Sequence, residues 1–131
     1  MHNSQCTMNM KEENIIEQKS KAFALRVIKL HQWLTDTKHE YVLSKQILRS
    51  GTSIGANVKE GVRAQSTPDF ISKLSIALKE AEETEYWLEL LHESGYIEEQ
   101  SFTSIYEDNK ELLRLLISII KTTKVNNGLQ L

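Results

Sequence analysis

The only proline in this chain of 131 residues, Pro68, stands at a position where a helix can begin. Ser66 and Thr67 offer hydroxyl caps just before it, and Asp69 adds an acidic residue to the first helical turn. Glycine is also scarce, with five residues, whereas Leu, Ile, Glu and Lys are abundant. Because proline and glycine are the residues that disfavour helix interiors most, this composition predicts an all-α protein.

Apolar residues recur at helical spacing in four segments of the chain. We expect helices over roughly residues 18–35, 41–63, 66–93 and 99–124. The connections between them are short, which is typical of an antiparallel, up-down four-helix bundle. We therefore expect a mobile N-terminal arm over residues 1–14, a bundle domain over 15–125 and a C-terminal tail over 126–131.

Two features inside these helices need an explanation. Gly51 and Gly55 lie within the second segment, where they indicate either a kink or a close helix crossing. In the third segment, Glu85 falls within the expected apolar stripe, which consists of Ile71, Leu74, Leu78, Ala81 and Leu88. A carboxylate on such a face must be paired, hydrogen-bonded or protonated. We expect a structural or oligomer contact, with Arg49, Ser53 or Asn57 as its partner.

No motif in the sequence indicates an enzyme. There is no phosphate-binding loop, nucleophile elbow or zinc spacing, and the single cysteine, Cys6, falls in the expected arm. A di-iron bundle needs two Glu-x-x-His pairs, and the helices offer one, Glu89 with His92. We expect no metal, no cofactor and no membrane span. The lone cysteine and the polar N-terminus favour the cytoplasm.

The apolar surface of the last two helices is wider than one bundle can bury. Seven apolar residues between 112 and 120 surround most of the fourth helix, and the third helix widens similarly near its C-terminal end. Such a surplus favours a homo-oligomer, although a broad monomeric core would also explain it. The expected interface residues are Tyr86, Trp87, Leu90, Leu113, Ile117 and Ile120.

Charge is unevenly distributed along the chain. The formal net charge is −2, but residues 1–63 carry a net +4 and residues 64–131 a net −6. Helical spacing groups the basic residues into two rows that could follow phosphates: Lys45, Arg49, Lys59 and Arg63 on the second helix, and Lys19, Arg26 and Lys29 on the first. The other interpretation is a solvated helix face. Few aromatic residues lie among these cations, so base stacking is not expected.

One string on the second helix resembles a known family signature. Ser53-Ile-Gly-Ala-Asn-Val-Lys-Glu-Gly61 is similar to the "SIPANIAEG" motif of the bacterial four-helix bundle family of ribosomal RNA intervening-sequence proteins. The stretches 23–34, 43–53 and 79–97 agree with that family in order and spacing, so that the resemblance covers about residues 14–124. Gly55 replaces the usual proline of the motif.

This resemblance implies an antiparallel four-helix protomer that assembles as a homopentameric barrel. A related branch is the accessory protein of diversity-generating retroelements, a basic pentamer that works with a reverse transcriptase and nucleic acid. By motif matching, Ser53, Asn57, Glu60, Glu83 and Glu85 are the signature positions. The acidic balance of this chain is unlike that basic branch.

Together these patterns predict a non-enzymatic, oligomeric scaffold or adaptor, with RNA or an RNA–protein complex as its partner besides itself. The alternative is a purely protein-binding module that uses the acidic surface of the third helix, around residues 80–99, without nucleic acid.

Overall fold

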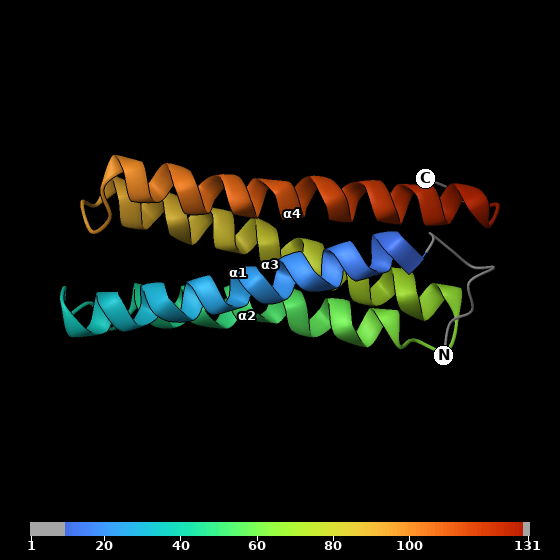
Figure 1. The fold of residues 1–131 in the computed structure, drawn as a ribbon, viewed down its shortest axis with the longest axis horizontal. Helices are drawn as coiled ribbons and strands as arrows, with labels where there is room; N and C mark the ends of the chain where they lie inside the picture. Colours follow the sequence, from blue (N-terminus) through green and yellow to red (C-terminus); the bar gives the residue numbers. More distant parts are fainter. Residues whose placement is uncertain (1–9, 130–131) are drawn as a thin grey trace.

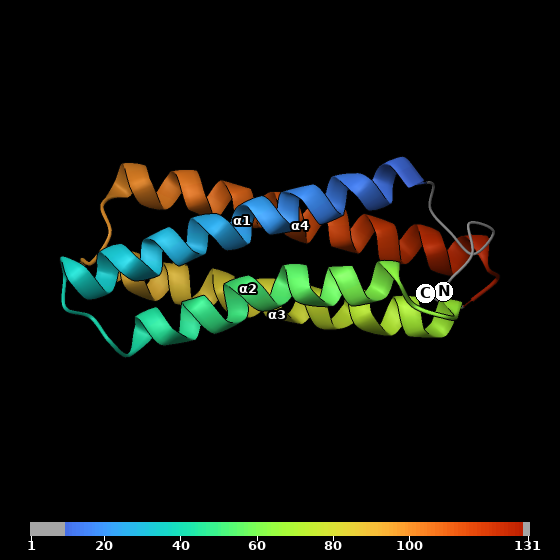
Figure 2. The same cartoon turned by 60° about the horizontal axis from the view of Figure 1, so that its bottom comes forward.

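The computed structural model describes residues 10–129, which form four α-helices and no strand. The helices are α1 (Met10–Asp36), α2 (Leu43–Val62), α3 (Thr67–Glu93) and α4 (Glu99–Asn126). Figures 1 and 2 show four long rods side by side, with the α1–α2 and α3–α4 connections at one end and the α2–α3 connection at the other. The predicted all-α fold is confirmed.

The helix α1 begins at Met10, eight residues before its expected start at Gln18. The extra turns are held by packing, because Ile16 is fully buried in the core and Glu13 is also buried. Tertiary contacts of this kind extend a helix where local sequence pattern is weak. Of the expected mobile arm, residues 10–14 are therefore helical, and residues 1–9 lie outside the described part of the chain.

Side-chain caps fix where two of the helices begin. The Ser66 hydroxyl accepts a hydrogen bond of 3.2 Å from the backbone N–H of Asp69, and Pro68 occupies the first turn of α3, as predicted. At the start of α2, the buried carboxylate of Glu40 accepts hydrogen bonds from the N–H groups of Val42, Leu43 and Ser44, the shortest being 2.7 Å. These donors would otherwise have no partner in the first turn.

The buried face of α3 contains the predicted Leu74, Ala81 and Leu88 but is centred slightly differently from the predicted stripe. Its buried residues are Phe70, Leu74, Ala77, Ala81, Thr84, Leu88 and Leu91. Ile71 and Leu78, assigned to the stripe, lie beside the core, and Thr84 rather than Glu85 occupies the central position. Thr84 is tolerated there because its hydroxyl bonds both Ser50 Oγ and the Glu80 carbonyl at 2.8 Å.

Gly51 marks a close helix crossing. A Cβ atom at this position would lie 2.8 Å from both methyl groups of Val27 on α1, and one at Gly55 would lie 3.3 Å from the Ser20 carbonyl oxygen. The helix α2 runs without interruption from Leu43 to Val62. A larger residue at Gly51 would force Val27 to move, because α1 approaches α2 closely at this point.

The apolar surplus of α4 is smaller than predicted. Leu113 and Ile120 are buried in the core of this single chain, so they do not form an outer face, and Ile117 remains 52% exposed. These two residues are buried because α4 packs against the core along a broad strip, so they offer little surface to another chain. Among the four pairs of neighbouring helices, α1 and α4 make the least extensive contact.

Candidate functional site

The structure divides the predicted basic residues into paired and unpaired groups. Lys19 pairs with Glu111 at 3.2 Å, and Arg26 pairs with Asp108 at 2.6 Å while it donates to Ser104. Arg49 is held by Glu80 at 3.3 Å and by Glu83. These three cations are therefore largely neutralised by α3 and α4.

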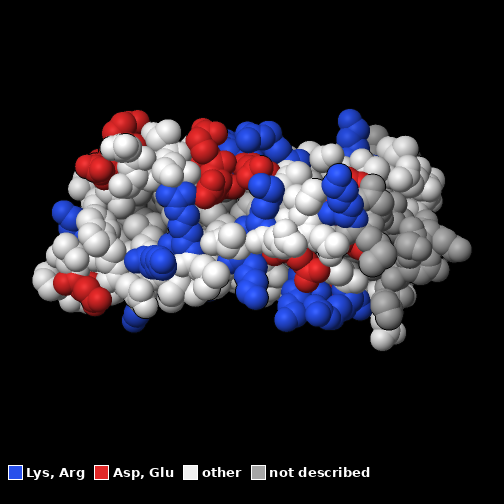
Figure 3. Space-filling view, viewed as in Figure 1, with Lys and Arg blue, Asp and Glu red and all other residues white. Residues whose placement is uncertain are grey.

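The remaining four predicted cations are exposed and have no ion-pair partner among residues 10–129. They are Lys29, Lys45, Lys59 and Arg63. Lys21, which belongs to neither of the two predicted basic rows, is also exposed and without an ion-pair partner among residues 10–129. Figure 3 shows Lys and Arg side chains over the part of the surface formed by α1 and α2. Unpaired cations are available for anions in a way that ion-paired ones are not.

A groove between α1 and α2 gathers three of these cations. Its cavity volume is about 520 Å³, and Lys21, Lys59 and Arg63 lie along it with Glu17 as the acidic lining residue. Small residues on the facing helices, Ala24, Thr52, Gly55 and Ala56, also line it. Lys21 was missed because it lies about 200° around α1 from Lys19, on a different face from the predicted row of Lys19, Arg26 and Lys29. The groove joins cations from two helices.

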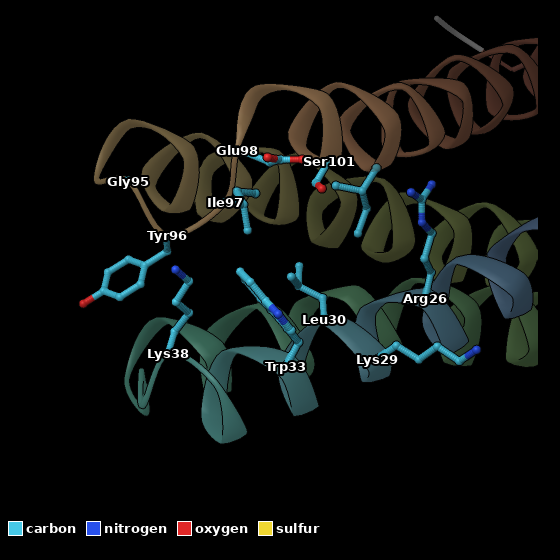
Figure 4. A pocket seen from close by; sticks show the side chains of 11 residues that line it. Arg26, Lys29, Leu30, Trp33, Lys38, Gly95, Tyr96, Ile97, Glu98 and Ser101 are labelled. Atoms are coloured by element: carbon cyan, nitrogen blue, oxygen red, sulfur yellow. The ribbon is translucent and has the colours of Figure 1, made fainter.

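A second cavity, of about 610 Å³, lies between α1 and the start of α4. Figure 4 shows its lining, in which the indole of Trp33 rises from α1 toward Ile97. Trp33 is 40% exposed, and Lys38 Nζ lies 5.4 Å from the centre of its ring. The sequence predicted few aromatic residues among the cations, and Trp33 is one that lies beside them. The spacing of Arg26, Lys29 and Trp33 places them on one helix face, and this signal was present in the sequence.

The signature side chains of α2 make hydrogen bonds and an ion pair within the protomer. Ser53 Oγ donates to the Arg49 carbonyl at 2.7 Å, and Asn57 Nδ2 donates to the Ser53 carbonyl at 2.9 Å. Glu60 lies 3.4 Å from Lys73 on α3. On α3, Glu83 accepts a hydrogen bond from Trp87 Nε1 at 2.9 Å besides its contact with Arg49. Of these contacts, the Glu60–Lys73 and Glu83–Arg49 pairs connect α2 to α3, and the others lie within one helix.

The partner of Glu85 is on α4. Glu85 pairs with Lys110, and its Oε2 lies 3.1 Å from the hydroxyl of Tyr106, whereas Arg49, Ser53 and Asn57 make other contacts. The Tyr106 hydroxyl also lies 2.8 Å from Glu89. Desolvation, followed by the hydrogen bonds to Glu89 and Glu85, raises the pKa of Tyr106 well above its ordinary value. The expected partners were wrong because Glu85 lies on the side of α3 that faces α4.

The six expected oligomer residues occupy three environments. Tyr86 and Ile117 are more than half exposed, Trp87 and Leu90 are half-buried, and Leu113 and Ile120 are buried. Only the first pair offers a large apolar surface to another chain. The rings of Tyr86 and Trp87 make an edge-on contact with their centres 5.2 Å apart.

The Glu89–His92 pair does not form a metal site. His92 Nε2 lies 2.9 Å from Glu99 and its ring stacks on Phe102, whereas Glu89 bonds Tyr106. Across residues 10–129, no group of three or more His, Cys, Asp or Glu side chains is arranged to hold a metal ion. None of the helices in that range is long and apolar enough to cross a membrane.

Comparison with known proteins agrees with this fold and with the α2 signature. Residues 12–118 match the family described as 23S rRNA-intervening sequence protein. The chain belongs to this family. A similar solved structure is a protein of unknown function from the S23 ribosomal protein family of Bacteroides thetaiotaomicron VPI-5482. It is 55% identical, with a TM-score of 0.83, and the match covers 84% of this chain and 98% of that one. A search of curated proteins gives no match.

Proposed function

We propose that this family member is a non-enzymatic, cytoplasmic scaffold that associates with RNA or an RNA–protein complex through the α1–α2 groove. The observation that supports this proposal is the set of cations at the groove, Lys21, Lys59 and Arg63, which have no ion-pair partner among residues 10–129. Two helices present them to one cavity, so a phosphate chain laid along the groove can contact all three. The family name refers to ribosomal RNA but gives no mechanism.

We also propose that the antiparallel, up-down protomer assembles with copies of itself, with a pentameric barrel as the expected form. Support comes from the exposed apolar side chains of Tyr86 and Ile117, which are 53% and 52% exposed. Multi-angle light scattering tests the assembly, with a pentamer mass expected at micromolar concentration. Tyr86→Asp with Ile117→Asp should lower the mass, and a monomeric mass for the unaltered chain contradicts assembly.

Charge reversal in the groove tests the RNA proposal. We expect Lys59→Glu with Arg63→Glu to weaken binding of structured RNA in a filter assay at low salt, because two favourable phosphate contacts become repulsive. Arg114→Glu with Lys121→Glu is the matched control, since it makes the same change in net charge at exposed positions of α4. Equal loss in both variants would indicate a general charge effect. No RNA binding by the unaltered protein would refute the proposal.

A purely protein-binding module that uses the acidic surface of α3 has less support. Of the acidic residues there, Glu80 and Glu83 already pair with Arg49, Glu85 with Lys110, and Glu89 bonds Tyr106. These carboxylates are thus partly satisfied within the protomer. This alternative predicts a protein partner in a pull-down experiment and RNA binding that is absent from the same preparation.

A further inference from the structure

The cavity between α1 and the start of α4 has the size and lining of a small-ligand site. Its volume of about 610 Å³ falls within the range of roughly 300–1,000 Å³ that is typical of ligand pockets. Such pockets combine a mainly apolar lining with a few polar groups that orient the ligand. Here Leu30, Ile97 and Ile105 are the apolar part, and Ser101 and Glu98 are polar.

A flat aromatic surface stands inside this cavity. Figure 4 shows the Trp33 indole and Leu30 extending from α1 toward Ile97 and Ser101, while the ring of Tyr96 points away from Trp33. The 40% exposure of Trp33 means that a large part of the indole is open to a ligand. A planar ligand can therefore stack on one aromatic wall and contact an apolar floor.

The charges around the indole favour an anion. Lys29 and Lys38 line the cavity without an ion-pair partner among residues 10–129, whereas Arg26 is held by Asp108. Figure 4 shows the Lys29 side chain extending away from Trp33, so Lys38 is the cation beside the indole. Glu98 is the acidic residue of the lining. Lys38 Nζ lies over the indole, 5.4 Å from its centre. A planar group that stacks on that face takes the place of the ammonium, which then becomes available to a negative group attached to the ligand.

We propose that this cavity binds one nucleotide unit, with the base stacked on Trp33 and its phosphate held by Lys38. A planar, apolar-faced ring joined to an anion matches both the indole and the Lys38 ammonium beside it. The unit can come from an unpaired residue of RNA or from a free mononucleotide. The RNA source rests on the proposed function, whereas the mononucleotide source does not.

Fluorescence of Trp33 tests the proposal directly. Trp87→Phe leaves Trp33 as the tryptophan of the full chain, since the sequence has two. We expect adenosine monophosphate or a short single-stranded RNA to quench its emission, because a stacked base lies against the indole. A blunt RNA duplex, whose bases are already stacked, should cause little change. Absence of quenching by both the nucleotide and the single strand overturns the proposal, as does equal quenching by the duplex.

Substitution of Trp33 separates this site from the α1–α2 groove. Trp33→Leu should weaken binding of the labelled single strand by roughly ten- to one-hundred-fold, the usual effect of losing one stacked base. Trp33→Phe should restore most of it, and circular dichroism should show that both variants are folded. If Lys59→Glu with Arg63→Glu weakens RNA binding but Trp33→Leu does not, the cavity proposal fails and the proposed function stands. If the mononucleotide alone quenches Trp33 and no RNA binds, the cavity stands as a mononucleotide site and the proposed function fails.

Discussion

The close crossing of α1 and α2 predicts the effect of adding one methyl group. In Gly51→Ala, the new Cβ would lie 2.8 Å from both Val27 methyls, although carbon atoms prefer about 3.5–4.0 Å. Val27 is fully buried, so it cannot move into solvent. Overpacking of this kind lowers the free energy of unfolding by about 2 kcal/mol. The better helix propensity of alanine raises it by about 1 kcal/mol. We expect Gly51→Ala to lower the free energy of unfolding by about 1 kcal/mol.

A double-mutant cycle isolates the cause. Val27→Ala alone removes buried methyl groups and should cost about 2 kcal/mol. In that background both 2.8 Å methyl contacts are absent, and the Cβ atom of residue 27, at 3.1 Å, is the nearest remaining atom. Gly51→Ala should therefore cost less than in the unaltered protein, with a coupling of about 1 kcal/mol. Equilibrium urea unfolding at fixed protein concentration measures all four proteins. Val58→Ala, a buried valine two turns along α2, should combine additively with Gly51→Ala. Stabilisation by Gly51→Ala in the unaltered background, with no coupling to Val27, would refute the reasoning.

Three further predictions concern caps and the α3–α4 contact. Glu40→Ala removes the acceptor of three backbone N–H groups of α2 and should cost about 1–3 kcal/mol in chemical unfolding, whereas an unchanged midpoint would contradict this role. Ser66→Ala should cost about 1 kcal/mol in the same assay, because the N–H of Asp69 loses its cap, and Ser66→Asp should retain the stability. The raised pKa of Tyr106 means that the unfolded chain loses this proton first, so stability should fall as pH rises above about 10. Tyr106→Phe should make that fall shallower in thermal melts, and identical pH profiles would contradict it.

The sequence predicted helix boundaries correctly where residues close together in the chain determine them. Ser66 and Pro68 define the start of α3 through their own backbone geometry, and both lie as expected. The start of α1 was missed because Ile16 is held by contacts with distant residues. On α3, the neighbours Thr84 and Glu85 differ by about 100° around the helix. Which of them faces the core depends on Ser50, 34 positions away, and no local pattern reports that contact.

In the candidate site, too, the sequence predicted what depends on local spacing and missed what depends on contacts between helices. Helical spacing placed Lys59 and Arg63 on one face, and the structure leaves both exposed. It could not show that Arg49 would be neutralised by Glu80, since that pairing depends on how α2 and α3 are packed. Four segments line the α1–α4 cavity: α1, the α1–α2 connection with Lys38, the α3–α4 connection and α4. Of that site, the sequence could predict only that Trp33 shares one face of its helix with Arg26 and Lys29.

The salt dependence of RNA binding tests the central claim most directly. If the α1–α2 groove contacts phosphates, the logarithm of the association constant should fall linearly with the logarithm of salt concentration, by about 0.7 for each phosphate contact with a single strand. Lys59→Ala with Arg63→Ala should reduce the slope by about 1.4, the share of two contacts. Arg114→Ala with Lys121→Ala should leave it unchanged. A slope that is insensitive to the groove variant, or equally sensitive to both, would contradict the assignment of this groove to RNA.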